Sequence, residues 1–199
     1  MAHLTSDPAI SLDGFMAGPD QDLEHPLGIG GEALHTWHFG QHERENAAEA
    51  AALVSAGAYV MGRNMFGPGR GAWDLDWRGW WGDEPPYHAP VFLLTHHPCD
   101  PLEMEGGTTF HFVTAGTDVA LGLAIEAAGD RHVSICGGAS TIRQFLAAGL
   151  IDELRLHVAP VVLGAGESPF TGLDDFPFEV ASSRSMALVT HMNLRRVRG

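Results

Sequence analysis

Residues 133–146 read VSICGGASTIRQFL, and this stretch says most about the fold. A short apolar run typical of a β-strand ends in the pair Gly137-Gly138, and the residues from Ser140 onward are typical of the first turn of an amphipathic helix. Two glycines allow a tight turn and let a ligand approach the backbone closely. Free N–H groups and the dipole at the start of a helix favour an anion. The stretch therefore predicts a pyrophosphate-binding turn, although a Gly-Gly pair also serves as an ordinary connection between a strand and a helix.

Length and composition restrict the class of protein. A chain of 199 residues fits one large domain or two small ones. With 45% hydrophobic and 18% charged residues it can bury a substantial core, which excludes a disordered chain. The formal net charge of −14 argues against a nucleic-acid-binding surface, because such a surface needs a basic footprint. Cys99 and Cys136 are too few and too far apart for a disulfide framework or a cysteine-based zinc site.

The sequence also bears on location and partners. No apolar run approaches the roughly 18 residues of a membrane span. The N-terminus, MAHLT, lacks the basic region and the apolar core of a signal peptide. We therefore expect a soluble, cytoplasmic protein whose partner is a small-molecule substrate, with no nucleic acid and no membrane.

Apolar runs alternate with helical patterns through the middle of the chain. Strands are expected at residues 9–12, 58–61, 90–95, 109–113, 132–136 and 152–160, and helices at 32–40, 43–56, 118–128 and 140–148. This alternation predicts one α/β domain over residues 1–199, with a mostly parallel sheet that helices cover on both faces. The tail, 178–187 and 189–197, predicts an antiparallel pair at the sheet edge. Residues 67–90, rich in Gly, Pro and Trp, predict an irregular excursion.

Several sequence blocks occur in the order of a known superfamily. They are SLDG at 11–14, VMGR at 60–63, FLLTH at 92–96, CGGAS at 136–140, and the span from IDEL at 151–154 to VVLGAG at 161–166. On these blocks, residues 9–197 resemble the dihydrofolate-reductase-like superfamily, and within it the branch of the reductase domain of bacterial riboflavin biosynthesis (RibD C-terminal-like). The resemblance implies a central eight-stranded sheet and NADPH as hydride donor. It also implies a homodimer, since relatives of this branch are commonly dimers.

The resemblance further implies a cleft between the first strand, the first helix and the Gly-Gly segment. By motif position, Gly62 and Arg63 would lie near the cofactor phosphates, Thr95 and His96 near the adenosine 2′-phosphate, Gly137, Gly138, Ala139, Ser140 and Thr141 around the pyrophosphate, and Met16, Ala17 and Gly18 in a mobile loop over the nicotinamide.

The chemistry of two of these positions agrees with the implied cofactor site. Arg63 offers a fork of donors suited to a phosphate, the alternative being a solvated surface arginine. Thr95-His96 can donate to phosphate oxygens, although His97-Pro98 would also make this segment a simple turn. A protonated histidine binds phosphate better, so His96 or His97 predicts an NADPH affinity that rises toward pH 6.

Reduction of a C=N or C=O bond also needs a proton, from a side chain or an ordered water. Glu32 and His35 are candidate donors, because they stand one helical turn apart and either can face the cleft. The alternative is a solvated Glu32 and a packed His35. Asp13 is the third candidate, although Asp-Gly after a strand is first of all a turn signal.

Tryptophans suggest how a substrate would bind. A flat heteroaromatic ring can stack on an indole. Trp37, in the first expected helix, and Trp73, in the excursion, are predicted to contact such a substrate, and Trp77, Trp80 and Trp81 offer further rings. The alternative is that these rings pack the excursion against the domain or against a partner subunit.

A substrate phosphate would need a second group of cations. Arg70 and Arg78 lie in the excursion and are the candidates, the alternative being ordinary surface charges. The expected substrate is a small, flat N-heterocycle, either pterin-like as in folate reduction or pyrimidine-like as in riboflavin precursors.

Three rival functions were compared with this interpretation. His35, His38 and His42 can share one helix face, but Gly40 interrupts the helix and no His-Glu-x-x-His is present, so no metal site is expected. A deaminase is excluded because its His/Cys–Glu and Pro-Cys-x-x-Cys zinc pattern is absent. A non-catalytic protein that binds a nucleotide or a flavin-like ligand on the same fold stays open.

The C-terminal segment bears on assembly. Phe176, Phe178 and Val180, followed by the alternating residues 186–189, can pair at a sheet edge and bury apolar surface between subunits. This pattern is compatible with the implied homodimer.

Overall fold

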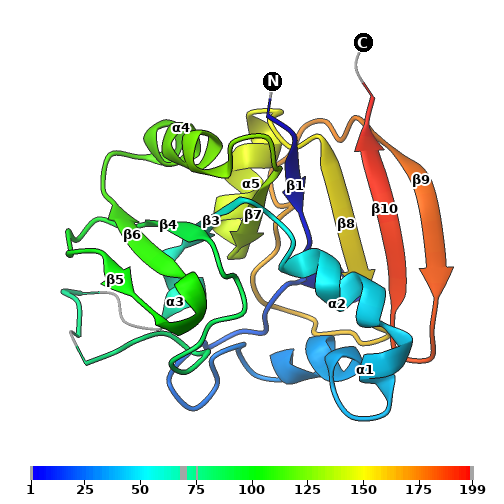
Figure 1. Ribbon diagram of the computed structural model, residues 1–199. Helices are drawn as coiled ribbons and strands as arrows, with labels where there is room; N and C mark the ends of the chain where they lie inside the picture. Colours follow the sequence, from blue (N-terminus) through cyan, green and yellow to red (C-terminus); the bar gives the residue numbers. More distant parts are fainter. Residues whose placement is uncertain (1, 68–70, 75, 198–199) are drawn as a thin grey trace.

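The computed structural model describes residues 2–67, 71–74 and 76–197 of the chain. Its centre is one sheet of ten strands in the order β5-β6-β4-β3-β7-β1-β8-β10-β9, with β2 paired to β8 outside this path (Figure 1). The strands are β1 Leu4–Ser6, β2 Ala9–Ile10, β3 Ala58–Gly62, β4 Pro90–Leu94, β5 Leu102–Glu103, β6 Thr109–Val113, β7 Val133–Gly137, β8 Glu153–Val158, β9 Phe178–Ser185 and β10 Thr190–Arg196. The pairs among β1, β2, β3, β4, β6, β7 and β8 are parallel, which confirms the predicted α/β domain with a mostly parallel sheet.

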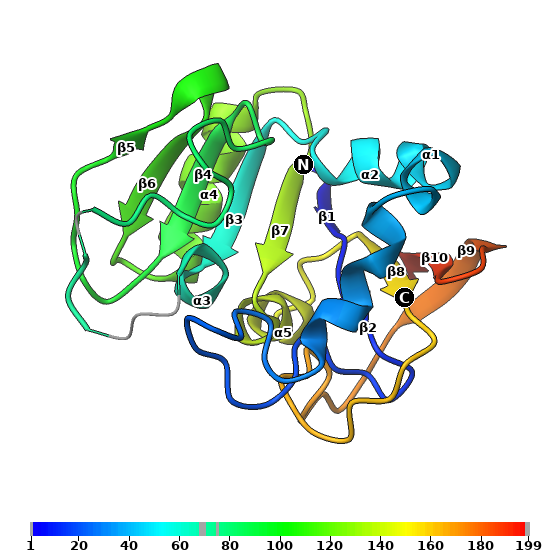
Figure 2. The same cartoon turned by 90° about the horizontal axis from the view of Figure 1, so that it is seen from below.

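Helices pack on this sheet and around its edge. They are η1 Gly31–His38, α1 His42–Glu45, α2 Ala47–Leu53, α3 Arg63–Phe66, η2 Glu105–Gly107, α4 Thr117–Ala128 and α5 Ala139–Ala147. Seen from below, η1, α1 and α2 lie beside β8 and the C-terminal strands, while α3 lies at the end of β3 (Figure 2). None of the helices in the described ranges is long and apolar enough to cross a membrane.

Alternating side chains of the central strands build one core cluster on each face of the sheet. Along β3, Ala58 and Val60 pack toward α4 and α5, whereas Tyr59 and Met61 pack on the opposite face. Helix α4 buries alanines spaced four residues apart, so it lies close to the sheet. The other face is covered by α3 and by the excursion at residues 67–90.

The excursion is fixed by its tryptophans. The indole N–H of Trp77 donates to the carbonyl of Phe66 at 2.9 Å, and Trp81 lies 5.3 Å from Tyr87, ring centre to ring centre. Trp73, Trp77 and Trp81 all pack against the same buried cluster. These three rings therefore pack the excursion on its own domain.

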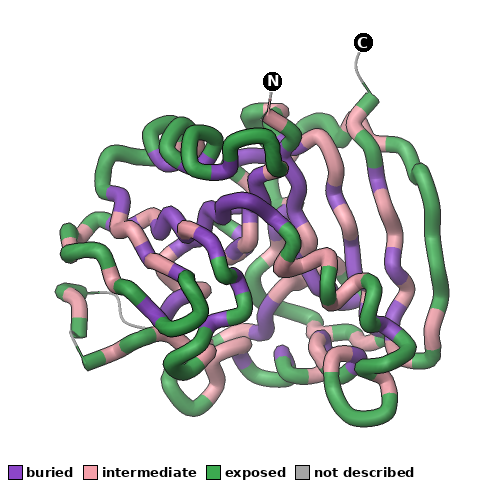
Figure 3. Tube along the Cα trace, in the orientation of Figure 1, coloured by how far each residue is buried: buried purple, intermediate pink, exposed green. Residues whose placement is uncertain are grey.

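The C-terminal strands confirm the expected antiparallel edge. β10 pairs antiparallel with β8 on one side and with β9 on the other. β9 is exposed along almost its whole length (Figure 3). Pairing of two subunits at this edge stays a prediction.

Four sequence expectations differ from the structure. The sheet has ten strands rather than the eight that the resemblance implies. The expected first strand at 9–12 is only β2, and a separate β1 precedes it because Pro8 has no N–H for a continuous ladder. The expected helix at 43–56 is two short helices that meet at the buried Asn46, and the helix expected at 32–40 is the 3₁₀ helix η1.

Candidate active site

A cleft of about 1310 Å³ opens at the carboxyl ends of the parallel strands. The residues that end or follow β1, β3, β4, β6 and β7 all line it: Asp7, Gly62, Arg63, Leu94, Thr95, Val113, Thr114, Gly137 and Gly138. The chain moves outward from β3 through β4 to β6 and then returns to place β7 between β3 and β1. Open α/β sheets bind ligands at such a reversal, outside the carboxyl ends of their strands.

The glycine turn after β7 leaves room for a ligand. Gly137 has a φ of 138°, which favours glycine, and Gly138 precedes the first residue of α5. The carbonyl of Gly138 accepts from the N–H groups of Thr141 and Ile142 at 2.9 and 3.1 Å. A Cβ added at Gly138 would meet nothing within 4 Å, so the space above this backbone is open. The first N–H groups of α5 therefore face a space that an anion can enter.

Gly62 has a different reason to lack a side chain. A Cβ at this position would overlap Oγ1 of Thr141 and approach Gly137 and Gly138 to 3.2 Å. The end of β3 therefore packs directly against the first turn of α5. This contact brings Arg63 beside the glycine turn.

Arg63 and the turn after β4 are held by one tryptophan. The guanidinium carbon of Arg63 lies 3.9 Å from the ring centre of Trp73, a cation–π contact. The indole N–H of Trp73 donates to the carbonyl of His97 at 2.7 Å, and Oγ1 of Thr95 accepts from the N–H of His97 at 3.1 Å. Trp73, predicted to contact substrate, is absent from the described cleft lining; it orients Arg63 instead.

The loop at residues 16–18, expected to be mobile over the nicotinamide, is held by backbone hydrogen bonds. Met16 and Ala17 line the cleft, whereas Gly18 does not. The N–H of Met16 donates to Glu167 at 2.8 Å, and that of Gly18 donates to Leu27 at 2.8 Å. A Cβ on Gly18 would overlap the carbonyl of Ile29, so this glycine serves loop packing.

The three predicted proton donors lie in different surroundings. Glu32 is exposed and lines the cleft, as does the half-buried His35. Asp13 lies outside the described lining, where its carboxylate accepts from the N–H groups of Leu163 and Gly164 at 3.1 and 2.7 Å. A hydrogen bond from Ser11, together with these backbone bonds, lowers the pKa of Asp13. Asp13 is therefore an ionised loop cap, in agreement with its turn signal.

Trp37 lines the cleft, although its side chain is almost completely enclosed by its neighbours. Its ring centre lies 3.6 Å from that of His38 and 4.9 Å from that of His157. The ring fills the space between η1 and the strands β8 and β10, and its contact with a substrate stays a prediction.

Histidines surround this buried ring. His35, His38 and His157 line the cleft, and Nδ1 of His157 lies 2.7 Å from Nδ1 of His191. Burial lowers the pKa of His157 to about 3 and that of His38 to about 4, and it also lowers the pKa of His35. These rings are uncharged at neutral pH. Within the described ranges, no group of three or more His, Cys, Asp or Glu is arranged to hold a metal ion.

Asp7 is the acidic group of the cleft that the sequence interpretation missed. Ser6 pairs with Leu154, so the next residue, Asp7, stands level with Arg155 on β8. Its Oδ1 lies 3.1 Å from Nη1 of Arg155, and its side chain is 6% exposed. Burial raises the pKa of Asp7 to about 7 although the charge of Arg155 opposes the shift. An Asp directly after a strand-like LTS run was the available signal, lost because the first strand was placed at residue 9.

The two expected substrate cations do not form a second anion site in the described structure. Arg70 lies outside the described residues. Arg78 lies outside the described cleft lining, donates to the carbonyl of Glu103 at 3.3 Å and pairs with Asp83 at 3.9 Å. Arg78 is thus an ordinary surface charge.

In this α/β fold, one cleft brings the glycine turn after β7 together with a carboxyl group whose pKa burial raises to about 7. The family model of the RibD C-terminal domain matches residues 2–192. The chain belongs to this family, which confirms the resemblance seen in its sequence blocks.

Solved structures agree with this assignment. A protein from Shewanella sp. PV-4, provisionally assigned to riboflavin biosynthesis, is 25% identical, with a TM-score of 0.64 and 100% of both chains covered. The deaminase/5-amino-6-(5-phosphoribosylamino)uracil reductase of Thermotoga maritima is 14% identical, with a TM-score of 0.59; the alignment covers 98% of this chain and 57% of that one. RibD of Acinetobacter baumannii is 15% identical, with a TM-score of 0.59, covering 100% and 59%. No curated protein matches the chain.

Proposed function

We propose that this protein is an NADPH-dependent reductase that transfers a hydride to a small, flat N-heterocycle. The observation that carries the proposal is the composition of one cleft: the glycine turn, Arg63 and Thr95 line it together with Asp7, a carboxyl group that keeps a proton near neutral pH. Its volume of about 1310 Å³ exceeds the roughly 300–1,000 Å³ of a single drug-sized site, so two ligands fit together. Membership of the RibD C-terminal family supports a reductase.

One half of the cleft suits the cofactor. The open space at Gly138 admits a pyrophosphate against the start of α5, and Arg63 and Thr95 offer donors to a 2′-phosphate. NADPH, when bound there, supplies the hydride. Trp73 keeps the guanidinium of Arg63 in place before the cofactor arrives, which lowers the entropic cost of binding.

The other half suits proton transfer to the substrate. Asp7 follows β1 and Gly137 ends β7, and these two strands are neighbours in the sheet. Because its pKa is about 7, Asp7 holds a proton in a large fraction of molecules at neutral pH and can donate it to a ring nitrogen. Arg155 fixes the carboxyl group and keeps its pKa from rising further.

Calorimetric titration with NADPH and, in parallel, NADH tests the cofactor assignment. We expect NADPH to bind at least about tenfold more tightly, because a charge-assisted hydrogen bond is worth on the order of 1.5–3 kcal/mol. Arg63→Met should reduce NADPH affinity to the level of NADH, while Arg78→Met, outside the cleft, should change nothing. Equal binding of both nucleotides would contradict the 2′-phosphate site. NADPH binding without oxidation by any pterin or pyrimidine tested would favour the ligand-binding alternative.

The two glycines of the turn should respond differently to substitution. Gly138→Val is expected to fold normally, since Gly138 has the ordinary φ of −71° and open space around it, but to weaken NADPH binding by about tenfold or more. Gly62→Ala is expected to lower the free energy of unfolding by about 1–3 kcal/mol, because its Cβ overlaps Thr141. Calorimetry and urea denaturation separate the two effects. Unchanged NADPH affinity in Gly138→Val would remove the turn from the cofactor site.

A further inference from the structure

A chain of hydrogen bonds behind the cleft fixes which nitrogen of His157 carries a proton. Nδ2 of Asn46 donates to the carbonyls of Trp37 and His42 at 3.2 and 2.8 Å, which leaves Oδ1 toward His191. Because that oxygen only accepts, Nε2 of His191, 2.9 Å away, is the donor. A neutral His191 then has a bare Nδ1, and the Nδ1–H of His157 donates to it at 2.7 Å.

The remaining nitrogen of His157 is consequently an acceptor. His157 is 3% exposed and lines the cleft, and its Nε2 has no hydrogen-bond partner in the described structure. A buried acceptor without a donor is unfavourable, because it has lost its hydrogen bonds to water without replacement. A ligand that brings an N–H or O–H group to this nitrogen removes that cost, whereas an anionic oxygen repels it.

The described lining of the cleft is also poor in cations. The chain has eleven arginines and no lysine. Among the described residues that line the cleft, Arg63 is the one arginine, and it belongs to the cofactor half. The half near β1 and β8 instead presents carboxyl groups, neutral imidazoles and aromatic or aliphatic groups: Asp7, Glu32, His35, His38, His157, Phe39, Leu53 and Val54.

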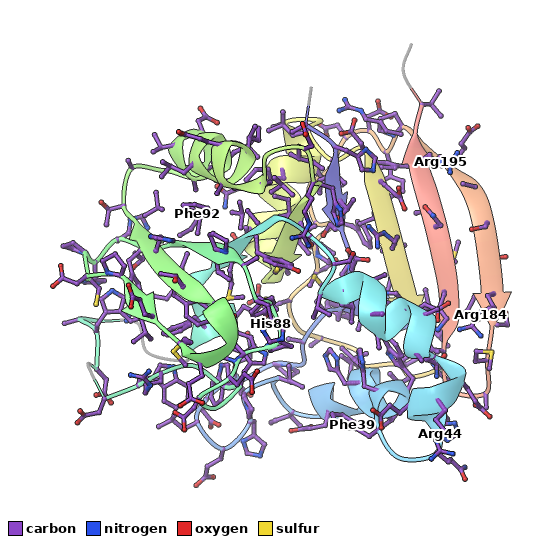
Figure 4. All side chains as sticks on the ribbon, in the orientation of Figure 1. Phe39, Arg44, His88, Phe92, Arg184 and Arg195 are labelled. Carbon is purple, nitrogen blue, oxygen red and sulfur yellow. The ribbon has the colours of Figure 1, made fainter. Side chains whose placement is uncertain are left out.

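The other described arginines lie outside the described cleft lining. Arg131 donates to the carbonyls of Ser55 and Ala56 at 2.7 and 2.8 Å, and Arg155 lies behind Asp7, between it and Glu153. Figure 4 shows Arg44 at α1 and Arg184 and Arg195 on the C-terminal strands. Burying a phosphate without a cation is expensive, so the half near β8 disfavours a phosphorylated ligand.

We propose that the substrate of this protein is an unphosphorylated flat heterocycle that donates an N–H or O–H hydrogen bond to Nε2 of His157. The proposal rests on the proposed reductase function and narrows its substrate class. The phosphoribosylamino compound named for the Thermotoga maritima protein carries a phosphate, and the present cleft is built for a molecule without one.

The first test asks which ring nitrogen of His157 carries the proton, by ¹⁵N NMR of the histidines in the free protein at pH 7. We expect His157 as the Nδ1–H form with a bare Nε2, and Asn46→Leu, which removes the acceptor for His191, to abolish this preference. His157 with a proton on Nε2 would overturn the proposal. Because no cofactor takes part, this result is independent of NADPH binding.

The absence of a second anion site is tested with inorganic phosphate in calorimetry. We expect weak binding to the free protein that disappears when NADP⁺ is bound and also in Arg63→Met. Phosphate binding that persists in the NADP⁺ complex would overturn the substrate proposal and leave the reductase intact. Failure of NADP⁺ itself to bind would instead overturn the proposed function, and the substrate proposal with it.

The phosphorylated and dephosphorylated forms of one compound then show directly which of the two the protein binds more tightly. With NADP⁺ bound, 5-amino-6-(5-phosphoribosylamino)uracil should bind at least about tenfold more weakly than the same compound after removal of its phosphate. His157→Phe, which keeps a flat ring but has no acceptor, should reduce the affinity of the dephosphorylated compound about tenfold. Tighter binding of the phosphorylated compound, or equal affinity in His157→Phe, would contradict the proposal.

Discussion

Asp7→Asn should lower kcat for hydride transfer about 100-fold or more, with little change in NADPH affinity. The amide keeps the shape of the carboxyl group but has no acidic proton, and general acid catalysis typically contributes about 10²–10⁴-fold. The rate of NADPH oxidation, measured with the best substrate from a panel of dihydropterins and aminopyrimidines, gives the comparison. Asp13→Asn is the matched control, because Asp13 lies outside the described cleft lining; it should leave kcat unchanged.

The pH dependence of kcat distinguishes an Asp7 that donates a proton from an Asp7 that only supports the structure. Burial raises the pKa of Asp7 to about 7, and the protonated form is the donor. The kcat of the wild-type protein should therefore fall as pH rises above about 7, while the residual kcat of Asp7→Asn should be flat across the same range. An Asp7→Asn variant that keeps the wild-type pH profile would show that another group supplies the proton.

Acidification should destabilise the fold between pH 6.5 and pH 4. The unfolded chain binds protons at its histidines near pH 6.5, whereas burial lowers the pKa of His157 to about 3 and that of His38 to about 4 in the folded protein. In this window the unfolded state holds more protons, so stability falls as pH falls. His157 amounts to on the order of 2 kcal/mol between pH 6 and pH 4.5, and the partly exposed His38 adds less because solvent screens it.

Asp7 acts in the opposite direction. Its pKa is raised in the folded protein, so between about pH 4 and pH 7 the folded state holds the extra proton and gains stability as pH falls. One carboxyl group does not offset two histidines whose pKa values are lowered by comparable amounts. Urea denaturation at pH 7.5, 6 and 5 measures the net slope, and His157→Gln should make it shallower. A free energy of unfolding that stays constant from pH 7.5 to pH 5 would contradict this account.

The cofactor half of the cleft was accessible from sequence because its signals are local. Gly137-Gly138 between a strand and a helix, and Gly62-Arg63 after a strand, each occupy a few consecutive residues whose backbone geometry the sequence largely determines. The structure brings both segments to one cleft through the contact of Gly62 with Thr141. Their role toward NADPH stays a prediction until the titration is done.

The roles of the tryptophans illustrate where local patterns fail. Trp37 and Trp73 are aromatic residues near the expected cleft, and nothing in their neighbours in sequence tells which face of the ring is free. Trp37 lines the cleft but is enclosed by His38 and His157, and Trp73 stacks on Arg63 outside the described lining. Packing between distant segments decides the accessibility of a side chain, so sequence pattern alone predicts it poorly.

The sequence by itself determined the family, the alternation of the central strands and helices, and the glycine turn between β7 and α5, because periodicity, glycine pairs and motif order are properties of short segments. Only the tertiary structure decided the chemistry of the substrate half. Asp7 acquires a pKa near 7 from burial beside Arg155, and His157 becomes a bare acceptor through His191 and Asn46. Asp7 and Arg155, and likewise Asn46 and His191, lie more than a hundred residues apart along the chain, and the burial and orientation that set a pKa or a tautomer arise only when the fold brings them together.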